Sequence, residues 1–246
     1  MRLFICLALC FSLVGLEPRL EPKRMKTSVI IPCHPAHFHL LENLLECYQN
    51  QTSVPDEVVI SLSQAYRIPE TLQQKLIEKM WRFTLKLLQN NRKVSAGGNR
   101  TLAAKHSSGD LLICQDADDL PHPQRVEIIK HLFEHFQIDH LMHQQTFHGE
   151  QFTPYRLSEL ESCCHYWQEG GATILNLVNG PTAITRSVLT QIHWKEFSGI
   201  GEDMLFNESV RKHFSHTAIL EAALIDYRLE FSTHFRNSHG EWQTKD

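Results

Sequence analysis

The chain has 246 residues, a length that suits one α/β domain with a substantial hydrophobic core. Hydrophobic residues make up 42% of the sequence and charged residues 21%, which excludes a disordered or low-complexity protein. The formal net charge of -4 lacks the basic excess of a nucleic-acid-binding protein, so no nucleic-acid partner is expected. The seven cysteines form no CxxC pair or regular framework, which favours a reducing compartment such as the cytoplasm.

The N-terminal segment, residues 1–24, has two interpretations that stay open. A positively charged start and the apolar run Leu3–Leu16 are typical of a signal peptide, and the run is shorter than the about 20 residues of a membrane span. Alternatively, the segment is an extended start, and Met25 leads into the first strand. Residues 25–246 are expected to form the folded domain. A true signal would make the protein secretory or anchored; otherwise it is expected in the cytoplasm, free or peripherally attached to a membrane.

The first part of the domain alternates between predicted strands and helices. Val29–Ile31 is a β-branched run ended by Pro32, which is typical of a strand buried on both faces of a sheet. The predicted elements are a strand at 28–31, a helix at 36–48, a strand at 57–62, a helix at 69–80 and a strand at 83–88. This order predicts right-handed βαβ units and a mostly parallel sheet.

A glycine pair opens the next predicted helix. Gly97-Gly98 begins a segment that runs to Ser108-Gly109, and the free N–H groups of such a helix start favour a phosphate or another anion. A Gly-Gly pair alone is more often a plain turn. Its position ahead of a strand and an acidic cluster strengthens the anion-binding interpretation.

Three carboxylates follow the next predicted strand. Leu111–Cys114 has the length of a buried strand. It is followed by Asp116, Asp118 and Asp119. In an open α/β sheet, ligands bind outside the carboxyl ends of the strands, and acidic side chains there hold a divalent cation together with substrate phosphates. Asp116 and Asp118 are two residues apart, so in extended geometry they point the same way. The cluster predicts a metal–diphosphate site; the alternative is a helix cap and a solvated turn.

Two further segments continue this series of motifs. Asn179–Arg186 contains Gly180-Pro181 and ends in an arginine, and Gly201–Phe206 contains the acidic pair Glu202-Asp203. The earlier members of the series are the strand Ser28–Pro32, the helix start Gly98-Asn99-Arg100, Gly109-Asp110 and the cluster Asp116–Asp119. Their order and spacing, over about residues 27 to 230, resemble the family 2 glycosyltransferases of the GT-A fold. The resemblance implies one GT-A domain, an α/β fold whose Rossmann-like, mixed, mostly parallel sheet is flanked by helices.

The resemblance also implies a reaction. A nucleoside-diphosphate sugar, with a UDP-sugar as the expected donor, gives its sugar to an acceptor hydroxyl with inversion at the anomeric carbon. The acceptor is an unidentified glycan, lipid or protein. A divalent cation, Mn²⁺ or Mg²⁺, is expected to stabilise the leaving diphosphate as a Lewis acid.

Roles for the acidic residues follow from the resemblance. Asp118 is the implied metal ligand, Asp116 faces the ribose or the metal, and Asp119 supports them. Asp203 is the implied general base that takes the proton of the acceptor, and Glu202 orients the acceptor or the base. The plain alternative is that Glu202 and Asp203 only charge a helix N-terminus favourably.

Further residues are implied in binding the donor. Arg100 and Arg186 are expected to pair with phosphates or with the acceptor, because guanidinium groups suit such anions. With Asp116, the implied donor-binding residues are Pro32, Ser61, Ser63, Asn99, Arg100 and Arg186.

The sequence departs from the family pattern in two places. Ser61–Gln64 stands where the family commonly has an acidic stretch that recognises the base and the ribose, so base recognition is unassigned. Tyr227–Glu230 stands where the family often has Tyr-Arg-x-His, so a histidine metal ligand is expected instead at His234 or His239. Trp194, near Asp203 in the sequence, is expected in the core rather than against a sugar ring.

Three other functions compete with glycosyl transfer. A degenerate GT-A protein would bind a nucleotide or sugar without transferring it, which the altered Ser61–Gln64 segment favours. A metal-dependent nucleotidyltransferase would use Asp116 and Asp118 for two metal ions and would not need Asp203. A secreted carbohydrate-binding protein is consistent with the N-terminal apolar run but is disfavoured by the cysteine pattern.

Overall fold

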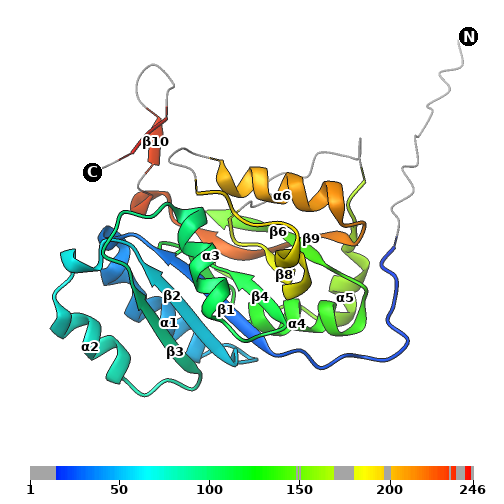
Figure 1. The fold of residues 1–246 in the computed structure, drawn as a ribbon. Coiled ribbons are helices and arrows are strands. Elements are labelled where there is room, and N and C mark those ends of the chain that lie inside the picture. Colours follow the sequence, from blue (N-terminus) through cyan, green and yellow to red (C-terminus); the bar gives the residue numbers. More distant parts are fainter. Residues whose placement is uncertain are drawn as a thin grey trace, which may run out of the picture.

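The computed structural model describes residues 15–147, 149, 151–168, 180–196, 201–232, 234–236 and 242–244. Figure 1 shows a central sheet with helices packed against both of its faces. The α-helices are α1 (Leu41–Gln49), α2 (Glu70–Glu78), α3 (Ala96–His106), α4 (Arg125–His135), α5 (Leu157–Ser162) and α6 (Glu202–His213). Short 3-10 helices are η1 (Pro35–Leu40), η2 (Ala65–Arg67), η3 (Arg186–Thr190) and η4 (Leu229–Phe231).

A mixed sheet of nine strands forms the centre of the described chain. Its strands are β1 (Thr27–Cys33), β2 (Glu57–Leu62), β3 (Thr84–Gln89), β4 (Leu111–Cys114), β5 (Leu120–Pro121), β6 (His140–Phe147), β7 (Cys164–Tyr166), β8 (Ala183–Thr185) and β9 (Thr217–Tyr227). Their order is β3-β2-β1-β4-β8-β6-β9-β5, and β7 pairs with β9 outside this path. Most paired residues lie in the parallel ladders among β1 to β4 and between β6 and β9. The predicted α/β fold with a mixed, mostly parallel sheet is therefore confirmed. A separate antiparallel pair joins β10 (His234–Arg236) to β11 (Trp242–Thr244).

The β-branched run of β1 is buried on both faces of the sheet. Successive side chains of a strand point in opposite directions, so neighbouring residues of the run enter two different cores. Val29 and Ile31 belong to a core that includes residues of α1 and α4. Ile30 belongs to a second core, with residues of α3 and α6. A polar residue at any of these three positions would enter one of the two cores, which explains why the run is continuous rather than alternating.

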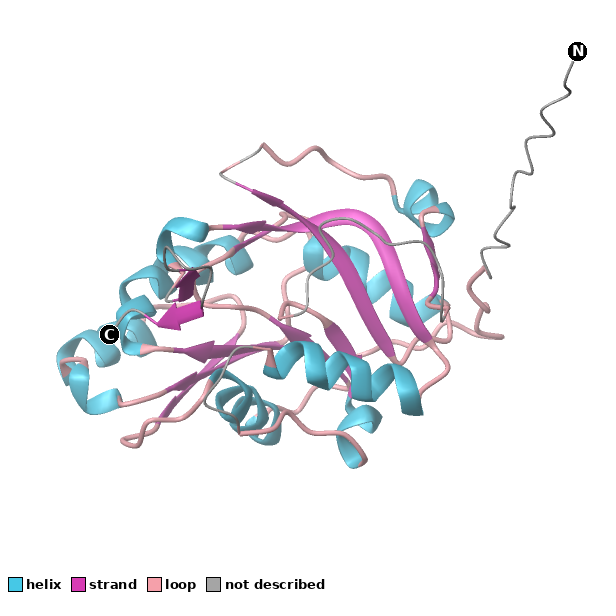
Figure 2. Cartoon of the chain, turned by 90° about the horizontal axis from the view of Figure 1, so that it is seen from above, coloured by secondary structure: helices cyan, strands magenta, loops and turns pink. Residues whose placement is uncertain are grey.

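The second half of the sheet is curved. In the ladder between β6 and β9 the register shifts on both sides of Gln144, which marks an irregularity of the β-bulge type. A bulge bends its strand and increases the local twist, and Figure 2 shows strongly curved strands when the sheet is seen from above. The far end of β9 thereby pairs with β5, with Asp226 opposite Leu120, directly beside the acidic cluster.

The N-terminal segment packs on the fold from residue 15 onward. Nitrogens of Arg19 and Lys23 donate hydrogen bonds of 2.7 to 3.0 Å to the carbonyl oxygens of Phe133, Glu134 and His135. These carbonyls end α4 and have no partner within the helix. Residues 15–24 lie before the expected domain boundary at residue 25, and they already contact the domain. Residues 1–14 lie outside the described chain, so the choice between a signal segment and an extended start stays a prediction. Across the described residues, every helix is too short or too polar to traverse a bilayer.

Candidate functional site

Candidate residues from distant parts of the chain meet at one edge of the sheet. Strands β1, β2 and β4 are parallel, so their carboxyl ends lie at the same edge, which is where open α/β sheets bind ligands. The starts of α3 and α6 reach this edge as well, and Figure 1 shows both helices on the same face of the sheet. The edge therefore combines strand ends with two helix N-termini.

Arg100, in the second turn of α3, joins two carboxylates. Its guanidinium is 2.6 Å from Asp116 Oδ1 and 3.2 Å from Glu202 Oε1, and the residue is 3% exposed. Burial lowers the pKa of Arg100, but the charges of Asp116 and Asp203 raise it more, so the side chain stays charged. The sequence predicted that Arg100 pairs with phosphates or with the acceptor; in this structure its partners are protein carboxylates.

Gly180 lies in the middle of this cluster. A Cβ atom added at Gly180 would clash with Asp116 Oδ2, and would lie 3.0 Å from an Arg100 nitrogen and 3.3 Å from Asp203 Oδ2. The backbone at Gly180 can come this close because it carries no side chain. Three of the predicted site residues, from α3, the loop after β4 and α6, therefore surround one glycine.

Glu202 and Asp203 occupy the first turn of α6. Burial raises the pKa of Glu202, while the charge of Arg100 opposes this shift. Asp203 Oδ1 accepts a hydrogen bond of 2.8 Å from the Met204 backbone nitrogen. The structure thus brings both predicted catalytic residues to Asp116 and Arg100. The plain alternative, that the two residues only place favourable negative charge at a helix N-terminus, also fits this position, so their catalytic roles stay predictions.

Asp118 and Asp119 lie on the loop after β4 and are held by Arg228. Arg228 Nε donates to the Asp118 carbonyl at 2.8 Å, and its backbone nitrogen donates to Asp119 Oδ1 at 3.0 Å. Burial raises the pKa of Asp118 to about 6, with the His37 charge opposing the shift. The pKa of Asp119 is raised well above its usual value. Burial is the largest cause, and the negative charges of Asp118 and Asp116 raise the pKa further.

His37 is a site residue that sequence reasoning missed. It lies in η1, which follows β1, and its Nε2 is 3.8 Å from Asp118 Oδ2. The same nitrogen donates to the Phe231 carbonyl at 2.9 Å. The available sequence clue was position: a histidine a few residues beyond the end of β1 must lie at the same edge as the residues beyond β4.

A buried arginine supports the site from behind. Arg125 is fully buried and donates to the carbonyl oxygens of Cys114 and Pro181, both at 2.9 Å. Cys114 ends β4 and Pro181 follows Gly180, so one side chain fixes the acidic loop relative to the glycine. Sequence reasoning gave Arg125 no role, because its partners are backbone atoms of segments that are far apart in the chain.

The predicted donor-binding residues at the end of β2 hydrogen-bond to α3 and to the loop that precedes it. Ser61 Oγ donates to Asn99 Oδ1 at 2.8 Å, and Pro32 lies opposite Ser61 in the ladder between β1 and β2. Ser63 Oγ accepts from the Val94 nitrogen at 2.9 Å. These bonds fasten the loop that leads into α3. Contact of these residues with a donor stays a prediction.

Arg186 is not brought to this site. Its guanidinium donates to the carbonyls of Gly109 and Ala104, at 2.7 and 3.2 Å, and to Ser107 Oγ at 2.9 Å. Because β8 runs antiparallel to β4, Arg186 lies at the opposite sheet edge, beyond the C-terminal end of α3. His234 is described only as a strand position in β10, and His239 lies outside the described residues, so both metal-ligand expectations stay predictions.

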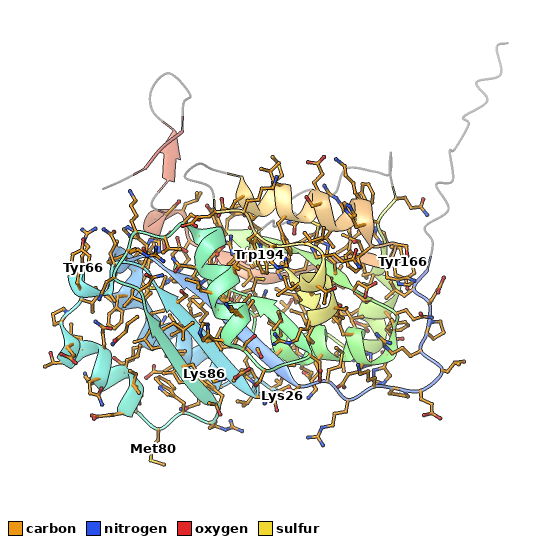
Figure 3. All side chains as sticks on the ribbon, viewed as in Figure 1. Lys26, Tyr66, Met80, Lys86, Tyr166 and Trp194 are labelled. Carbon is orange, nitrogen blue, oxygen red and sulfur yellow. The ribbon has the colours of Figure 1, made fainter. Side chains whose placement is uncertain are left out.

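Trp194 packs in the core, as its default interpretation expected. Its ring stacks on Phe206 with centroids 4.1 Å apart, and the residue is 4% exposed. Figure 3 labels Trp194 between the sheet and α6. Stacking of this residue on a sugar ring is therefore ruled out in this arrangement.

The donor atoms of the acidic loop fit a hard cation in part. Asp119 Oδ2 is buried and has no hydrogen-bond partner in the described chain. Within that same part of the chain, no three His, Cys, Asp or Glu side chains are arranged to hold a metal ion by themselves. Mg²⁺-type sites commonly use one or two carboxylates, with substrate phosphates and water completing the shell. The loop suits this second kind of site.

The chain is similar to known proteins in sequence and in fold. The family model described as Glycosyl transferase family 2 matches residues 28–192. No curated protein matches the sequence. S. aureus TarS 1-349 in complex with UDP has a TM-score of 0.62 at 20% identity, covering 83% of this chain and 61% of that chain. The same protein in complex with UDP-GlcNAc has a TM-score of 0.62 at 20% identity, with 83% and 58% covered.

A second solved structure adds a different donor. The mannosyltransferase PcManGT from Pyrobaculum calidifontis, in complex with GDP-Man and Mn2+, has a TM-score of 0.57 at 16% identity. The match covers 87% of this chain and 59% of that chain. This chain therefore spans about three-fifths of the length of these structures. At such identities the likeness shows a shared fold, the GT-A fold that the sequence motifs implied.

Proposed function

Because the chain belongs to glycosyl transferase family 2, we propose that it transfers a sugar from a nucleoside-diphosphate sugar to an acceptor hydroxyl, with inversion at the anomeric carbon. One observation carries the proposal. Arg100 links Asp116, on the loop after β4, to Glu202, which precedes Asp203 at the start of α6. The residues assigned to the donor and to the acceptor therefore form one cluster.

The proposed reaction is a direct displacement at the anomeric carbon. The acceptor hydroxyl attacks this carbon, Asp203 takes the hydroxyl proton, and the bond between the carbon and the diphosphate oxygen breaks. Glu202, held by Arg100, orients the acceptor or Asp203. Gly180 lies among Asp116, Arg100 and Asp203, so no side chain at that position separates the reacting groups.

A divalent cation, Mn²⁺ or Mg²⁺, would neutralise charge that develops on the leaving diphosphate. Asp118 is the residue that would hold it, and the unpartnered oxygen of Asp119 is a further candidate donor atom. Asp116 is less available as a ligand, because one of its oxygens is already paired with Arg100. The Mn2+ in the PcManGT structure supports this part of the proposal.

The proposed donor is a UDP-sugar. The TarS structures contain UDP and UDP-GlcNAc, and the PcManGT structure contains GDP-Man, so the fold accommodates more than one base. The acceptor is a glycan, a lipid or a protein, and a lipid acceptor would require peripheral attachment to a membrane.

The first test is the thermal stability of the full chain with UDP, GDP, CDP and their sugars, each with and without Mn²⁺. A ligand that binds only the native state raises its stability by about 2.7 kcal/mol at a hundredfold excess over the dissociation constant. We expect a Mn²⁺-dependent shift with one nucleotide, lost in Asp118→Asn and kept in Asp110→Asn. Asp110 is the matched control, because it precedes β4 at the opposite edge of the sheet. A folded protein that no nucleotide stabilises would contradict the proposal.

The second candidate is a GT-A protein that binds a nucleotide without transferring sugar. The observation that favours it is that Ser61, Ser63 and Asn99 are engaged with one another and with nearby backbone. Turnover separates the two functions. We expect Asp203→Asn to abolish sugar transfer while the nucleotide-induced stability shift remains. Binding without turnover in the unaltered protein would support the second candidate instead.

A further inference from the structure

Gln115 is a fully buried side chain that the proposed reaction does not use. It follows β4 and directly precedes the acidic loop Asp116–Asp119. Its Nε2 donates to the carbonyl oxygens of Asp116 at 2.8 Å and of Asp119 at 3.2 Å. The Asp119 backbone nitrogen in turn donates to the Asp116 carbonyl at 3.3 Å. One buried amide therefore holds both ends of the turn that carries Asp118.

Two buried side chains, from α1 and α4, set the orientation of this amide. The Arg125 guanidinium donates to the Tyr48 hydroxyl at 3.1 Å, and this hydroxyl donates to Gln115 Oε1 at 2.7 Å. A guanidinium can only donate, so the single proton of the Tyr48 hydroxyl is directed at Gln115. Burial raises the pKa of Tyr48 to about 12, with the Arg125 charge opposing the shift, so the hydroxyl keeps this proton. Gln115 must accept with Oε1, and its N–H groups therefore face the loop.

The acidic loop has a second support in Arg228, which is half-buried. Arg228 Nε donates to the Asp118 carbonyl, and its backbone nitrogen donates to Asp119 Oδ1. Together, Gln115 and Arg228 engage the carbonyl oxygens of Asp116, Asp118 and Asp119. The backbone of the loop is thereby fixed by side chains of the protein itself, and with it the places from which the carboxylates extend.

We propose that Gln115, oriented by Tyr48, is a positioning residue for donor binding, an inference that rests on the proposed function. Gln115 does not touch the donor. It acts through Asp116 and Asp118, because it holds the backbone of the turn that places both carboxylates at the candidate site. A buried polar network whose members are hydrogen-bonded favours one arrangement of the groups attached to it. Removal of the Gln115 N–H groups would leave buried carbonyls without this donor and release the turn.

The test compares Gln115→Met with Gln73→Met in the full chain. Methionine has a similar length but no N–H group. Gln73 is also buried, its Nε2 donates to the carbonyls of Ala65 and Ile68 at 3.1 and 2.9 Å, and its Oε1 accepts from Gln89. It is the matched control, because it has the same kind of contacts at a turn without candidate acidic residues. We expect both variants to be destabilised to a similar degree in urea.

Nucleotide binding separates positioning from stability. Isothermal titration calorimetry with UDP, GDP and CDP, each with and without Mn²⁺, gives the Kd and, separately, the fraction of molecules that bind. A purely structural role of Gln115 would lower that fraction and leave the Kd of the native molecules unchanged. We expect the Kd of the nucleotide that the unaltered chain binds to rise at least about tenfold in Gln115→Met, because a misplaced supporting group loosens the site. The Kd in Gln73→Met should stay unchanged.

A second variant, Tyr48→Phe, removes the proton that orients Gln115 and keeps the amide in place. We expect a smaller rise of the nucleotide Kd, about threefold, because one hydrogen bond within the network is lost. Phenylalanine fills nearly the same volume as tyrosine. Tyr48→Phe therefore decides the test if Gln115→Met does not fold.

The outcomes separate this inference from the proposed function. An unchanged Kd in Gln115→Met overturns the inference, as does an unchanged Kd in Tyr48→Phe where Gln115→Met does not fold. An equal rise in Gln73→Met also overturns it, because a buried amide away from the acidic loop would then matter as much. If the unaltered chain still binds the nucleotide and transfers sugar in these cases, the proposed function stands without Gln115. A folded, unaltered chain that binds no nucleotide contradicts both.

Discussion

Arg100 is the single residue on which the arrangement of the candidate site depends most. It is 3% exposed and pairs with Asp116 and Glu202. Without its charge, two half-buried carboxylates would face Asp203 with no cation between them, and breaking a buried ion pair costs about 3–5 kcal/mol. We expect Arg100→Met to lower the free energy of unfolding by about 3 kcal/mol or more, measured by urea denaturation.

The conservative variant separates the catalytic contribution of Arg100 from stability. Arg100→Lys keeps the charge but cannot bridge both carboxylates with a planar fork. We expect kcat to fall on the order of 10²-fold, because the acidic groups lose their fixed positions. Arg156→Lys, at an exposed arginine, is the control and should leave kcat unchanged. Full activity in Arg100→Lys would show that the double ion pair is not needed for the reaction.

The acidic residues of the site were predictable from the sequence, and their partners were not. Asp116, Asp118 and Asp203 follow a strand end or begin a helix, which are local features of the chain. Gly180 matters only because remote segments approach it, and no local pattern encodes that approach. The only clue to His37 was its position just beyond the strand at the start of the domain. Arg186 is the opposite case. Its motif predicted an anion partner, but β8 is antiparallel to β4, so Arg186 lies at the edge of the sheet where β4 begins, away from the site.

At the scale of elements, Glu57 ties three strands together at that other edge. Its carboxylate accepts hydrogen bonds from Ser28 Oγ at 2.6 Å, from Lys86 Nζ at 2.7 Å, and from Ser108 ahead of β4. Figure 3 labels Lys86, which lies on β3 and donates to Glu57. Burial raises the pKa of Glu57, but these hydrogen bonds lower it more, to about 2.

This low pKa makes the stability of the strands depend on pH. The unfolded chain has a glutamate pKa of about 4.3, so the charged carboxylate stabilises the fold above that pH, and its contribution is lost as the pH falls toward 2. We expect Glu57→Gln to lower the free energy of unfolding at pH 7 by about 1.5–3 kcal/mol, and the difference from the unaltered protein to shrink between pH 4.5 and 2. Urea denaturation across this range measures it, with exposed Glu70→Gln as the control. An equal loss at both ends of the range would contradict the assignment.

The elements of the first half of the chain were more predictable than those of the second. The strand expected at 57–62 is β2, and the strand expected at 83–88 is β3 shifted by one residue. The helix expected at 36–48 is divided into η1 and α1, because Pro35 starts a tight turn directly beyond β1. By contrast, β8 has only three residues and β9 is shaped by its irregular ladder with β6, so neither has a pattern that periodicity detects.

At the scale of the whole molecule, residues 15–24 act as a cap on α4. Arg19 and Lys23 supply donors to the last carbonyls of that helix. Deletion of residues 1–24 removes these hydrogen bonds, each worth about 1 kcal/mol. We therefore expect it to lower the free energy of unfolding by about 2–3 kcal/mol in urea denaturation. Deletion of residues 1–14 alone is the control and should cost much less; equal losses would show that the contacts from residue 15 onward contribute nothing.

The paired guanidinium of Arg100 also has an entropic consequence. Asp116 and Glu202 are held in place by an internal partner, so their rotational freedom is lost once, when the chain folds, and not again in each catalytic cycle. A polar environment that is ordered before the substrate arrives needs little reorganisation at the transition state. The rate of the proposed reaction should accordingly have a small unfavourable activation entropy, set by how the two substrates meet rather than by how the protein orders itself around them.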